Sequence, residues 1–265
     1  MYPILVRIGP ISLPTYGLMM AIGVGLGLWF LYLQSKKQGL DAPKIFDAGF
    51  YTILISLAGA KLILLLGNLS YYLHYPGELL SLARSGGVFQ GGLAFGVVFA
   101  LFYFRRRHIP TWKTADIVGP ALALGHGFGR VGCFMAGCCY GRVCESPLGV
   151  RFHSQFAHDL TGIPLGIGLY PVQLFEAVLN FLNFFFLYLI LRRKSFDGQV
   201  FSLYIVFYSV IRIGTEFFRG DHPEKAFLVR GFSPFLSLTF PQLFGLVGIF
   251  AGFFLYFILK KKSSV

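Results

Sequence analysis

Apolar residues occur along this chain in long, nearly uncharged runs that short polar stretches separate. A run of about 20 apolar residues can cross the hydrocarbon core of a bilayer as an α-helix. The pattern predicts seven transmembrane helices: 13–34, 45–67, 88–104, 114–135, 170–191, 199–218 and 238–259. The third run is the shortest, and Gln90, Gly91 and Gly92 at its start predict an irregular entry that lines a cavity.

The composition agrees with a membrane protein. Hydrophobic residues make up 55% of the 265 residues and charged residues only 13%, whereas an ordinary soluble domain carries about 25% charged residues. A net charge of +12 in an apolar chain favours basic cytoplasmic loops over a nucleic-acid partner, so we expect no nucleic acid. No basic region precedes the first apolar run, so we expect no cleavable signal peptide. The fold class is an all-α integral membrane protein, with one polytopic domain over residues 1–265.

Basic residues gather in every second connection, and this asymmetry predicts the orientation. Positively charged short loops lie in the cytoplasm, which places the N-terminus outside and the C-terminus inside. The cytoplasmic positions are Lys36, Lys37, Lys44, Arg105, Arg106, Arg107, Lys113, Arg192, Arg193, Lys194, Lys260, Lys261 and Lys262. Two long loops, at about 136–169 and 219–237, then lie outside, and loops of that length are usually functional. They carry Cys138, Cys139, Cys144, His153, His158, Asp159, Arg219, Asp221, His222 and Glu224.

Polar side chains within the predicted spans form rows on helix faces. Tyr208, Arg212 and Glu216 are four residues apart and share one face. His126 and Arg130 have the same spacing. Ionisable groups at membrane depth are candidates for function, because an unpaired charge there is costly. We interpret a third row of polar side chains as forming hydrogen bonds between helices. This row contains Gln173, Glu176, Asn180 and Asn183.

The balance of intramembrane charge indicates an anionic ligand. Arg130, Arg212 and Lys61 face few buried carboxylates, namely Glu176 and Glu216. Guanidinium groups bind phosphate oxygens through parallel hydrogen bonds. A site among apolar helices that opens to the outer face would therefore hold a phospholipid head group.

All four cysteines lie in or just beyond a glycine-rich run from Gly129 to Gly141. One interpretation is a disulfide or two in the outer loop, since an extracytoplasmic location favours oxidation. The other is a reactive thiolate at Cys133 or Cys138, because Arg130 nearby lowers a thiol's pKa. The spacing Cys-x4-Cys-Cys-x4-Cys does not match the usual pairs of a structural zinc site, so no metal is expected.

With these residues in view, the chain resembles the phosphatidylglycerol–prolipoprotein diacylglyceryl transferases over most of its length. Five segments carry the resemblance, in the order found in that family: Tyr16-Gly17, Gln90-Gly91-Gly92-Leu93, Gly129 to Gly141, Pro171 to Ala177 and Tyr208 to Arg219. The resemblance implies transfer of a diacylglyceryl group from phosphatidylglycerol to the lipobox cysteine thiol of a secreted prolipoprotein, with release of glycerol phosphate. It also implies seven spans in the bacterial cytoplasmic (inner) membrane, among membrane lipids, and no cofactor.

The resemblance assigns roles to individual residues. Arg130 and Arg212 hold the lipid phosphate, and Glu216 and Tyr208 orient Arg212. Tyr16 and Gln90 line the reacting end of the site. The catalytic set is Arg130, Arg212, His126 and Tyr16; the substrate-binding set is Arg130, Arg212, Glu216, Tyr208, Gln90, Gly91, Gly92, Cys133 and Cys138.

Several positions depart from the family pattern. Gln90 replaces a histidine that is a candidate base, and glutamine cannot take a proton at neutral pH. Cys133, Ala136 and Cys138 replace two asparagines and a glutamate of the signature. Lys61 replaces an arginine; this change keeps the positive charge but loses the planar guanidinium that can form two parallel hydrogen bonds.

Two questions follow from these departures. His126 lies on the face of Arg130 and either takes over as the base or hydrogen-bonds Gln90 or a backbone carbonyl between helices. The protein either follows the family reaction or is a divergent paralogue with another acceptor, with Cys138 as a covalent carrier in one version. A catalytically silent lipid-binding membrane protein is the third alternative.

Overall fold

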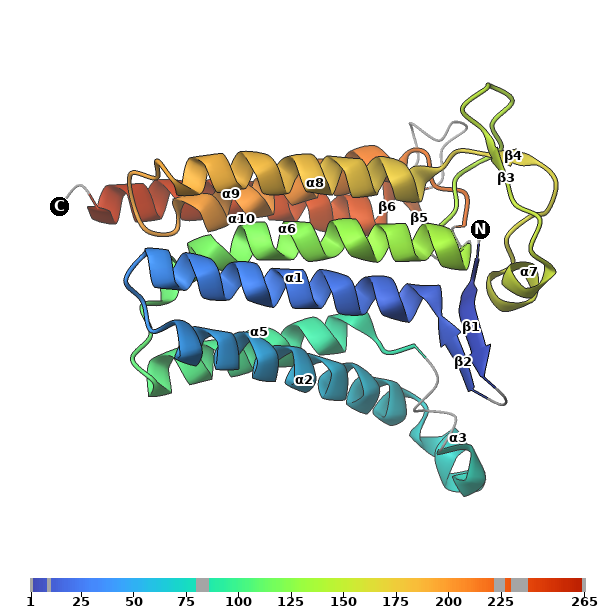
Figure 1. The fold of residues 1–265 in the computed structure, drawn as a ribbon, viewed down its shortest axis with the longest axis horizontal. Helices are drawn as coiled ribbons and strands as arrows, with labels where there is room; N and C mark the ends of the chain where they lie inside the picture. Colours follow the sequence, from blue (N-terminus) through green and yellow to red (C-terminus); the bar gives the residue numbers. More distant parts are fainter. Residues whose placement is uncertain (1, 9–10, 80–85, 222–226, 230–237, 264–265) are drawn as a thin grey trace. The chain divides into compact units, whose positions relative to one another are not determined.

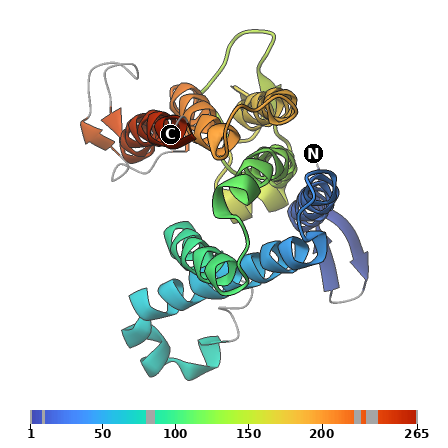
Figure 2. The same cartoon turned by 90° about the vertical axis from the view of Figure 1, so that its left-hand side faces the viewer.

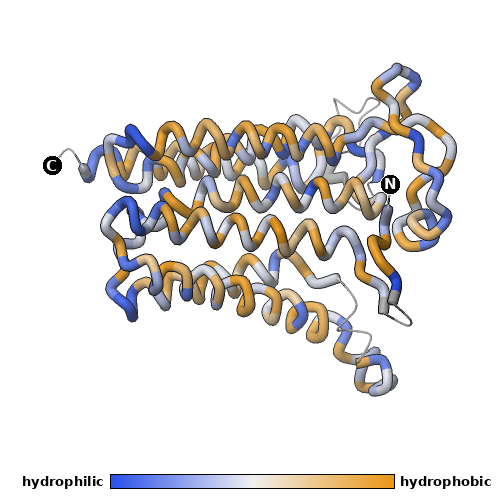
Figure 3. The backbone as a smooth tube through the Cα atoms, in the orientation of Figure 1, coloured by the Kyte–Doolittle hydropathy of each residue, from blue (hydrophilic) through white to orange (hydrophobic). Residues whose placement is uncertain are grey.

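Long α-helices occupy all seven ranges that the hydropathy pattern predicts (Figure 1). The computed structural model describes residues 2–8, 11–79, 86–221, 227–229 and 238–263. The long helices are α1 (Thr15–Lys37), α2 (Ala42–Gly67), α5 (Phe89–Arg106), α6 (Thr111–Ala136), α8 (Val172–Leu191), α9 (Gln199–Glu216) and α10 (Phe240–Ser263). Hydrophobic residues predominate along these helices, and hydrophilic residues gather near many of their ends (Figure 3).

Within the described part of the chain, four helices are long and apolar enough to cross a membrane: α1, α2, α8 and α10. The other three long helices, α5, α6 and α9, are less apolar. The protein is therefore mostly helical with several candidate spans. The count of seven spans and their orientation stay predictions.

Short elements occur where the sequence predicted only loops. Among the described residues, three antiparallel two-stranded ribbons form: β1 (Ile4–Ile8) with β2 (Ile11–Pro14), β3 (Val150–Arg151) with β4 (Gly168–Leu169), and β5 (Phe227–Val229) with β6 (Leu238–Thr239). The connections also contain α3 (Leu69–His74), the 3-10 turn η1 (Pro76–Glu78) and α7 (Gln155–Thr161). Strands of two to five residues are too short to show a clear hydropathy period, so the purely α-helical expectation missed them.

Contacts divide the chain into two compact units, residues 28–114 and residues 1–27 with 115–265. In the first of these, α2 packs along α5. A Cβ on Gly91 would lie 2.6 Å from Ile63 Cγ1, and one on Gly92 would lie 3.0 Å from the Ser56 carbonyl oxygen. These glycines sit in a regular helical turn and let two helices approach closely, where an irregular entry was predicted. A single membrane domain over residues 1–265 stays a prediction.

In the other unit, α9 packs against both α8 and α10 (Figure 2). Small residues permit the close contact with α10. A Cβ on Gly245 would lie 2.6 Å from Ile213 Cγ1, and one on Gly252 would lie 2.6 Å from Val206 Cγ2. This packing places α9, which carries Arg212 and Glu216, between two neighbouring helices.

A buried carboxylate near the start of α6 binds the N-terminus of α9. Asp116 is fully buried and accepts hydrogen bonds from the backbone N–H groups of Gly198 and Val200, each at 2.8 Å. Lys194 Nζ lies 2.8 Å from its Oδ2 atom. The positive end of a helix dipole and an ammonium group together compensate this buried charge. Asp116 therefore fixes α6 against α9.

The long connection between α6 and α8 folds around a small core of its own. Phe152, Ala157, Ile163 and Leu169 are buried together. His158 Nδ1 lies 2.7 Å from the Ile163 carbonyl oxygen, which gives this histidine a structural partner. The second predicted loop is described only in part, and His222 and Glu224 lie outside the described residues.

Candidate functional site

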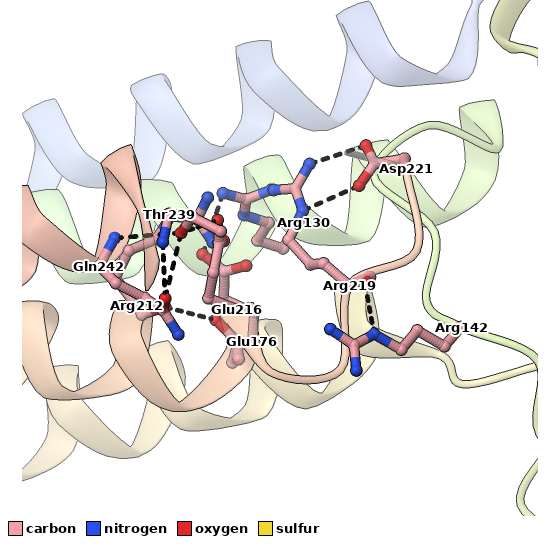
Figure 4. A network of polar contacts seen from close by, with 10 residues as sticks. Arg130, Arg142, Glu176, Arg212, Glu216, Arg219, Asp221, Thr239 and Gln242 are labelled. Atoms are coloured by element: carbon pink, nitrogen blue, oxygen red, sulfur yellow. Dashed lines mark hydrogen bonds and ion pairs between the residues drawn. The ribbon is translucent and has the colours of Figure 1, made fainter. Parts of the chain in front are cut away.

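Arg130 on α6 pairs with Glu176 on α8 (Figure 4). Arg130 Nη2 lies 2.9 Å from Glu176 Oε1, and Glu176 is almost completely buried. Arg130 lies on the same face of α6 as His126, one helical turn earlier. Glu176 lies on the buried polar row of α8 that includes Gln173 and Asn180. The sequence placed Glu176 in that row and gave it no role in the site. Its pairing with Arg130 depends on how α6 packs against α8, which the sequence does not show.

Arg212 pairs with Glu216 one turn later on α9, as their spacing predicts. Arg212 Nη1 lies 2.6 Å from Glu216 Oε2. Glu216 is buried, and its Oε1 atom accepts a hydrogen bond of 2.9 Å from the Thr239 hydroxyl. The backbone N–H of Thr239 in turn donates to Gln242 Oε1 at 2.9 Å. Glu216 is therefore held from two sides and can fix the orientation of Arg212.

A third arginine lies just after α9. Arg219 makes a bidentate pair with Asp221, with Nε 2.9 Å from Oδ1 and Nη2 2.7 Å from Oδ2. Its carbonyl oxygen accepts a hydrogen bond of 3.0 Å from Arg142 Nε. Gly141 and Arg219 form an isolated antiparallel bridge, and a Cβ on Gly141 would lie 2.7 Å from Tyr170 Cβ. The last glycine of the Gly129 to Gly141 run is thus required where two segments join the end of α9.

These pairs change the expected charge balance. Each of Arg130, Arg212 and Arg219 has a carboxylate partner within the site. The shortage of negative charge that the sequence suggested is not found among these residues. A guanidinium still presents five N–H donors, so contact with one carboxylate leaves chemical capacity for a second anion.

His126 lies in an aromatic stack beside this network. Its Nδ1 atom lies 3.4 Å from the Tyr204 hydroxyl, and its ring centroid lies 4.8 Å from that of Tyr208. Tyr208 is close enough to Glu176 and Arg130 to interact electrostatically with both. The partner of His126 is therefore a tyrosine on α9, where the sequence suggested Gln90 or a backbone carbonyl as the alternative to catalysis.

Three cysteines meet where α6 ends. The sulfur atoms of Cys133, Cys138 and Cys139 all lie within 4.8 Å of one another. The backbone N–H groups of Gly137 and Cys138 both donate to the Cys133 carbonyl, at 2.9 and 3.2 Å. Gly137 has φ +82° and Cys139 has φ +58°, so the chain reverses direction and returns over the last helical turn. The spacing of the cysteines in the sequence did not predict this cluster.

All four cysteines are free thiols in this structure, so the interpretation with a disulfide in the outer loop is not supported. The apolar core and hydrogen bonds hold the connection instead. Hydrogen bonds from the other two thiols hold the pKa of Cys139 below the usual thiol value, and the positive charges of Arg219 and Arg130 act in the same direction. Cys144 is separate and lies 3.1 Å from Ser146, measured from Sγ to Oγ.

Tyr16 near the start of α1 lies close to the same cluster. A Cβ on Gly132 would lie 3.1 Å from Tyr16 Cδ2, so the glycine makes room for the tyrosine against α6. Tyr16 also interacts electrostatically with Arg130 and with the sulfur of Cys133. The structure therefore gathers Tyr16, Arg130 and the cysteines around one end of α6.

The remaining predicted site residues lie in the unit of residues 28–114. Gln90 is exposed in the first turn of α5, and Gly91 and Gly92 are buried against α2. Their part in substrate binding stays a prediction. The site residues outside the predicted sets are Glu176, Cys139, Arg219 and Asp221. The first three lie within segments that carry the family resemblance, and Asp221 follows Arg219 by two positions.

Comparisons with known proteins identify the family of this chain. The sequence profile of the prolipoprotein diacylglyceryl transferase family matches residues 3–258. The phosphatidylglycerol–prolipoprotein diacylglyceryl transferase of Clostridium tetani is 35% identical over 90% of this chain and 93% of its own. The enzyme of the same name from Desulfotalea psychrophila is 32% identical over 99% of this chain and 95% of its own. The chain therefore belongs to the prolipoprotein diacylglyceryl transferase family.

Proposed function

We propose that this protein transfers the diacylglyceryl group of phosphatidylglycerol to the lipobox cysteine thiol of a secreted prolipoprotein. The match to the family over residues 3–258 carries the proposal. The buried network of Arg130, Glu176, Arg212 and Glu216 supports it, because fixed charges beside apolar helices suit a phospholipid head group. The proposal makes the protein a transferase and excludes a silent lipid-binding role.

The reaction takes place at the outer face of the bacterial cytoplasmic membrane. Basic residues end α1, α5 and α10, and the positive-inside rule assigns those ends to the cytoplasm. The chain then crosses seven times, with the N-terminus outside and the C-terminus inside. The C-terminal ends of α6 and α9, next to the cysteines and Arg219, then lie at the outer face, where the secreted substrate arrives.

Arg130 and Arg212 bind the lipid phosphate. Glu176 and Glu216 contact them at 2.9 and 2.6 Å, which holds each guanidinium in one orientation. The remaining N–H donors bond the phosphate oxygens and stabilise the charge that grows there as glycerol phosphate leaves. Tyr208 interacts electrostatically with Glu176 and with both arginines.

The chemical step is a displacement at carbon. The substrate thiol loses its proton, and the thiolate sulfur attacks the glycerol carbon that carries the phosphate ester. A carbon–sulfur bond forms, the carbon–oxygen bond breaks, and its electron pair leaves with glycerol phosphate. His126 accepts the thiol proton, since Gln90 cannot, and its contact with the Tyr204 hydroxyl orients the ring. Tyr16 lines the reacting end, where it interacts electrostatically with Arg130.

A direct assay tests the function. Purified protein in detergent with phosphatidylglycerol is incubated with a lipobox peptide that carries cysteine or serine at the acceptor position. We expect release of glycerol phosphate and a thioether-linked diacylglyceryl peptide by mass spectrometry, with the cysteine peptide only. Release without peptide modification would favour the divergent paralogue with another acceptor. Binding of lipid without release of glycerol phosphate would overturn the proposal in favour of a silent lipid-binding protein.

A further inference from the structure

The three-cysteine cluster has nearly the dimensions of a zinc site. Zinc–sulfur bonds of about 2.3 Å in a tetrahedron place the sulfur atoms about 3.8 Å apart. The sulfurs of Cys133, Cys138 and Cys139 already lie within 4.8 Å of one another. Rotation of the cysteine side chains closes a difference of at most about 1 Å. Soft thiolate ligands in this number suit zinc better than magnesium or calcium.

The backbone holds the cysteines in this arrangement at a cost. Cys139 has φ +58°, a left-handed conformation that residues with a Cβ adopt only when the surroundings enforce it. The carbonyl oxygen of Cys138 accepts a hydrogen bond of 2.8 Å from Gln173 Nε2, and the Gly137 carbonyl accepts one of 3.0 Å from the Thr161 hydroxyl. Two separate segments therefore fix the turn that gathers the sulfurs.

The surrounding charge also suits a metal–thiolate centre. Three thiolates on Zn²⁺ leave a net charge of −1. Arg219 and Arg130 interact electrostatically with the Cys139 sulfur, so two guanidinium groups compensate that charge. Cys133 is buried while Cys138 and Cys139 are half-buried, which leaves one side of the cluster accessible.

Within the described part of the chain, the group contains three ligands and no fourth histidine, cysteine or carboxylate. Structural zinc sites are closed by four protein ligands, whereas catalytic sites have three and leave one position open for water or substrate. The substrate of the proposed reaction is itself a thiol, which is the kind of ligand that completes a set of three sulfurs.

We propose that Cys133, Cys138 and Cys139 bind one zinc ion and that the acceptor cysteine of the prolipoprotein occupies its fourth position. This inference rests on the proposed function. Zinc would lower the pKa of a coordinated thiol, and His126 accepts its proton. The bound thiolate then attacks the lipid carbon, the carbon–oxygen bond breaks, and glycerol phosphate departs with the electron pair. A metal-activated thiol needs only a weak base, which accounts for Gln90 where the family has a histidine.

Zinc content tests the site without any use of activity. The full chain is purified in detergent from cells grown with zinc, and the metal is measured by mass spectrometry. We expect one zinc per chain in the wild type and in the matched control Cys144→Ser, and less than a tenth of that in Cys138→Ser and Cys139→Ser. Cys139→His, which keeps a zinc ligand, should retain the metal and guards against loss by misfolding. A metal-free wild type, equal zinc in every variant, or a disulfide among the three cysteines would overturn the site.

Cobalt substitution tests the open position. Addition of a lipobox peptide with cysteine should change the ligand-field spectrum of the cobalt-loaded protein, and the serine peptide should not. An unchanged spectrum with both peptides would refute thiol binding at the metal. Full transfer activity after zinc removal would refute the metal's role and leave the proposed function intact. A thiol-dependent spectrum without any glycerol phosphate release would support the metal site and refute the transfer reaction.

Discussion

Arg130 and Glu176 lie 46 positions apart in the sequence, and their side chains meet at 2.9 Å between α6 and α8. The carboxylate is 2% exposed and the guanidinium side chain 20% exposed. Loss of one partner of such a pair leaves the other charge uncompensated, which typically costs about 3–5 kcal/mol. The pair therefore combines a structural role with the proposed binding of phosphate. Unfolding measurements report on the first role, and glycerol phosphate release reports on the second.

Removal of Glu176 should destabilise the protein more than removal of both partners. We expect Glu176→Gln to lower the free energy of unfolding by about 3 kcal/mol. The double change Glu176→Gln with Arg130→Gln should recover most of that loss, because no buried charge remains. Thermal unfolding in detergent measures both. Additive losses in the double variant would contradict an energetic coupling between these residues.

Replacement of the site arginines should abolish transfer. Arg130→Ala and Arg212→Ala remove donors that bind the phosphate, and lysine at either position restores little because an ammonium lacks the planar fork. We expect at least a hundredfold loss of glycerol phosphate release, on the order of 3 kcal/mol of transition-state stabilisation. Arg105→Ala, at an exposed position at the end of α5, is the matched control. Near-normal turnover of Arg130→Lys would contradict the bidentate contact.

His126 should be needed for proton transfer. His126→Gln removes the proton acceptor and should lower the rate with little change in lipid binding. The double change His126→Leu with Gln90→His restores the family's usual histidine position and should recover part of the rate. Tyr204→Phe, which removes the hydroxyl 3.4 Å from the ring, should have a smaller effect. A fully active His126→Gln protein would show that another group, the cysteine cluster first, activates the thiol.

Asp116 should be needed for stability and not for chemistry. Asp116→Ala leaves the backbone N–H groups of Gly198 and Val200 and the ammonium of Lys194 without their shared acceptor. We expect a loss of about 3 kcal/mol in the free energy of unfolding, measured by thermal melting, with transfer per folded molecule unchanged. Asp197→Ala, an exposed partner of the same lysine, is the control and should cost less than about 1 kcal/mol. Equal losses in both variants would argue against this role.

Topology reporters test the orientation. An enzyme reporter that is active only in the cytoplasm should be active when fused after Lys194 or Lys262. The same reporter fused near Arg151 should be silent, because that residue lies in the loop predicted to be outside. Activity near Arg151 would reverse the orientation and place the proposed site on the wrong side for a secreted substrate.

The sequence by itself determined where the long helices lie and which residues are candidates for the chemistry. Hydropathy along one helix is a local property, so all seven predicted ranges correspond to helices within a few residues of their ends. The spacing of Arg212 and Glu216 likewise predicted their ion pair, because a helix places residues four apart on one face. The order of the motifs along the chain indicated the family by resemblance.

Only the tertiary structure decided which residues meet. The pairing of Arg130 with Glu176, and of Asp116 with the start of α9, depends on how separate helices rotate and cross. The cysteine cluster depends on a left-handed turn at Gly137 and Cys139 that reverses the chain after α6. Spacing in the sequence carries no information on such reversals, because contact between distant residues is set by packing and not by local propensity.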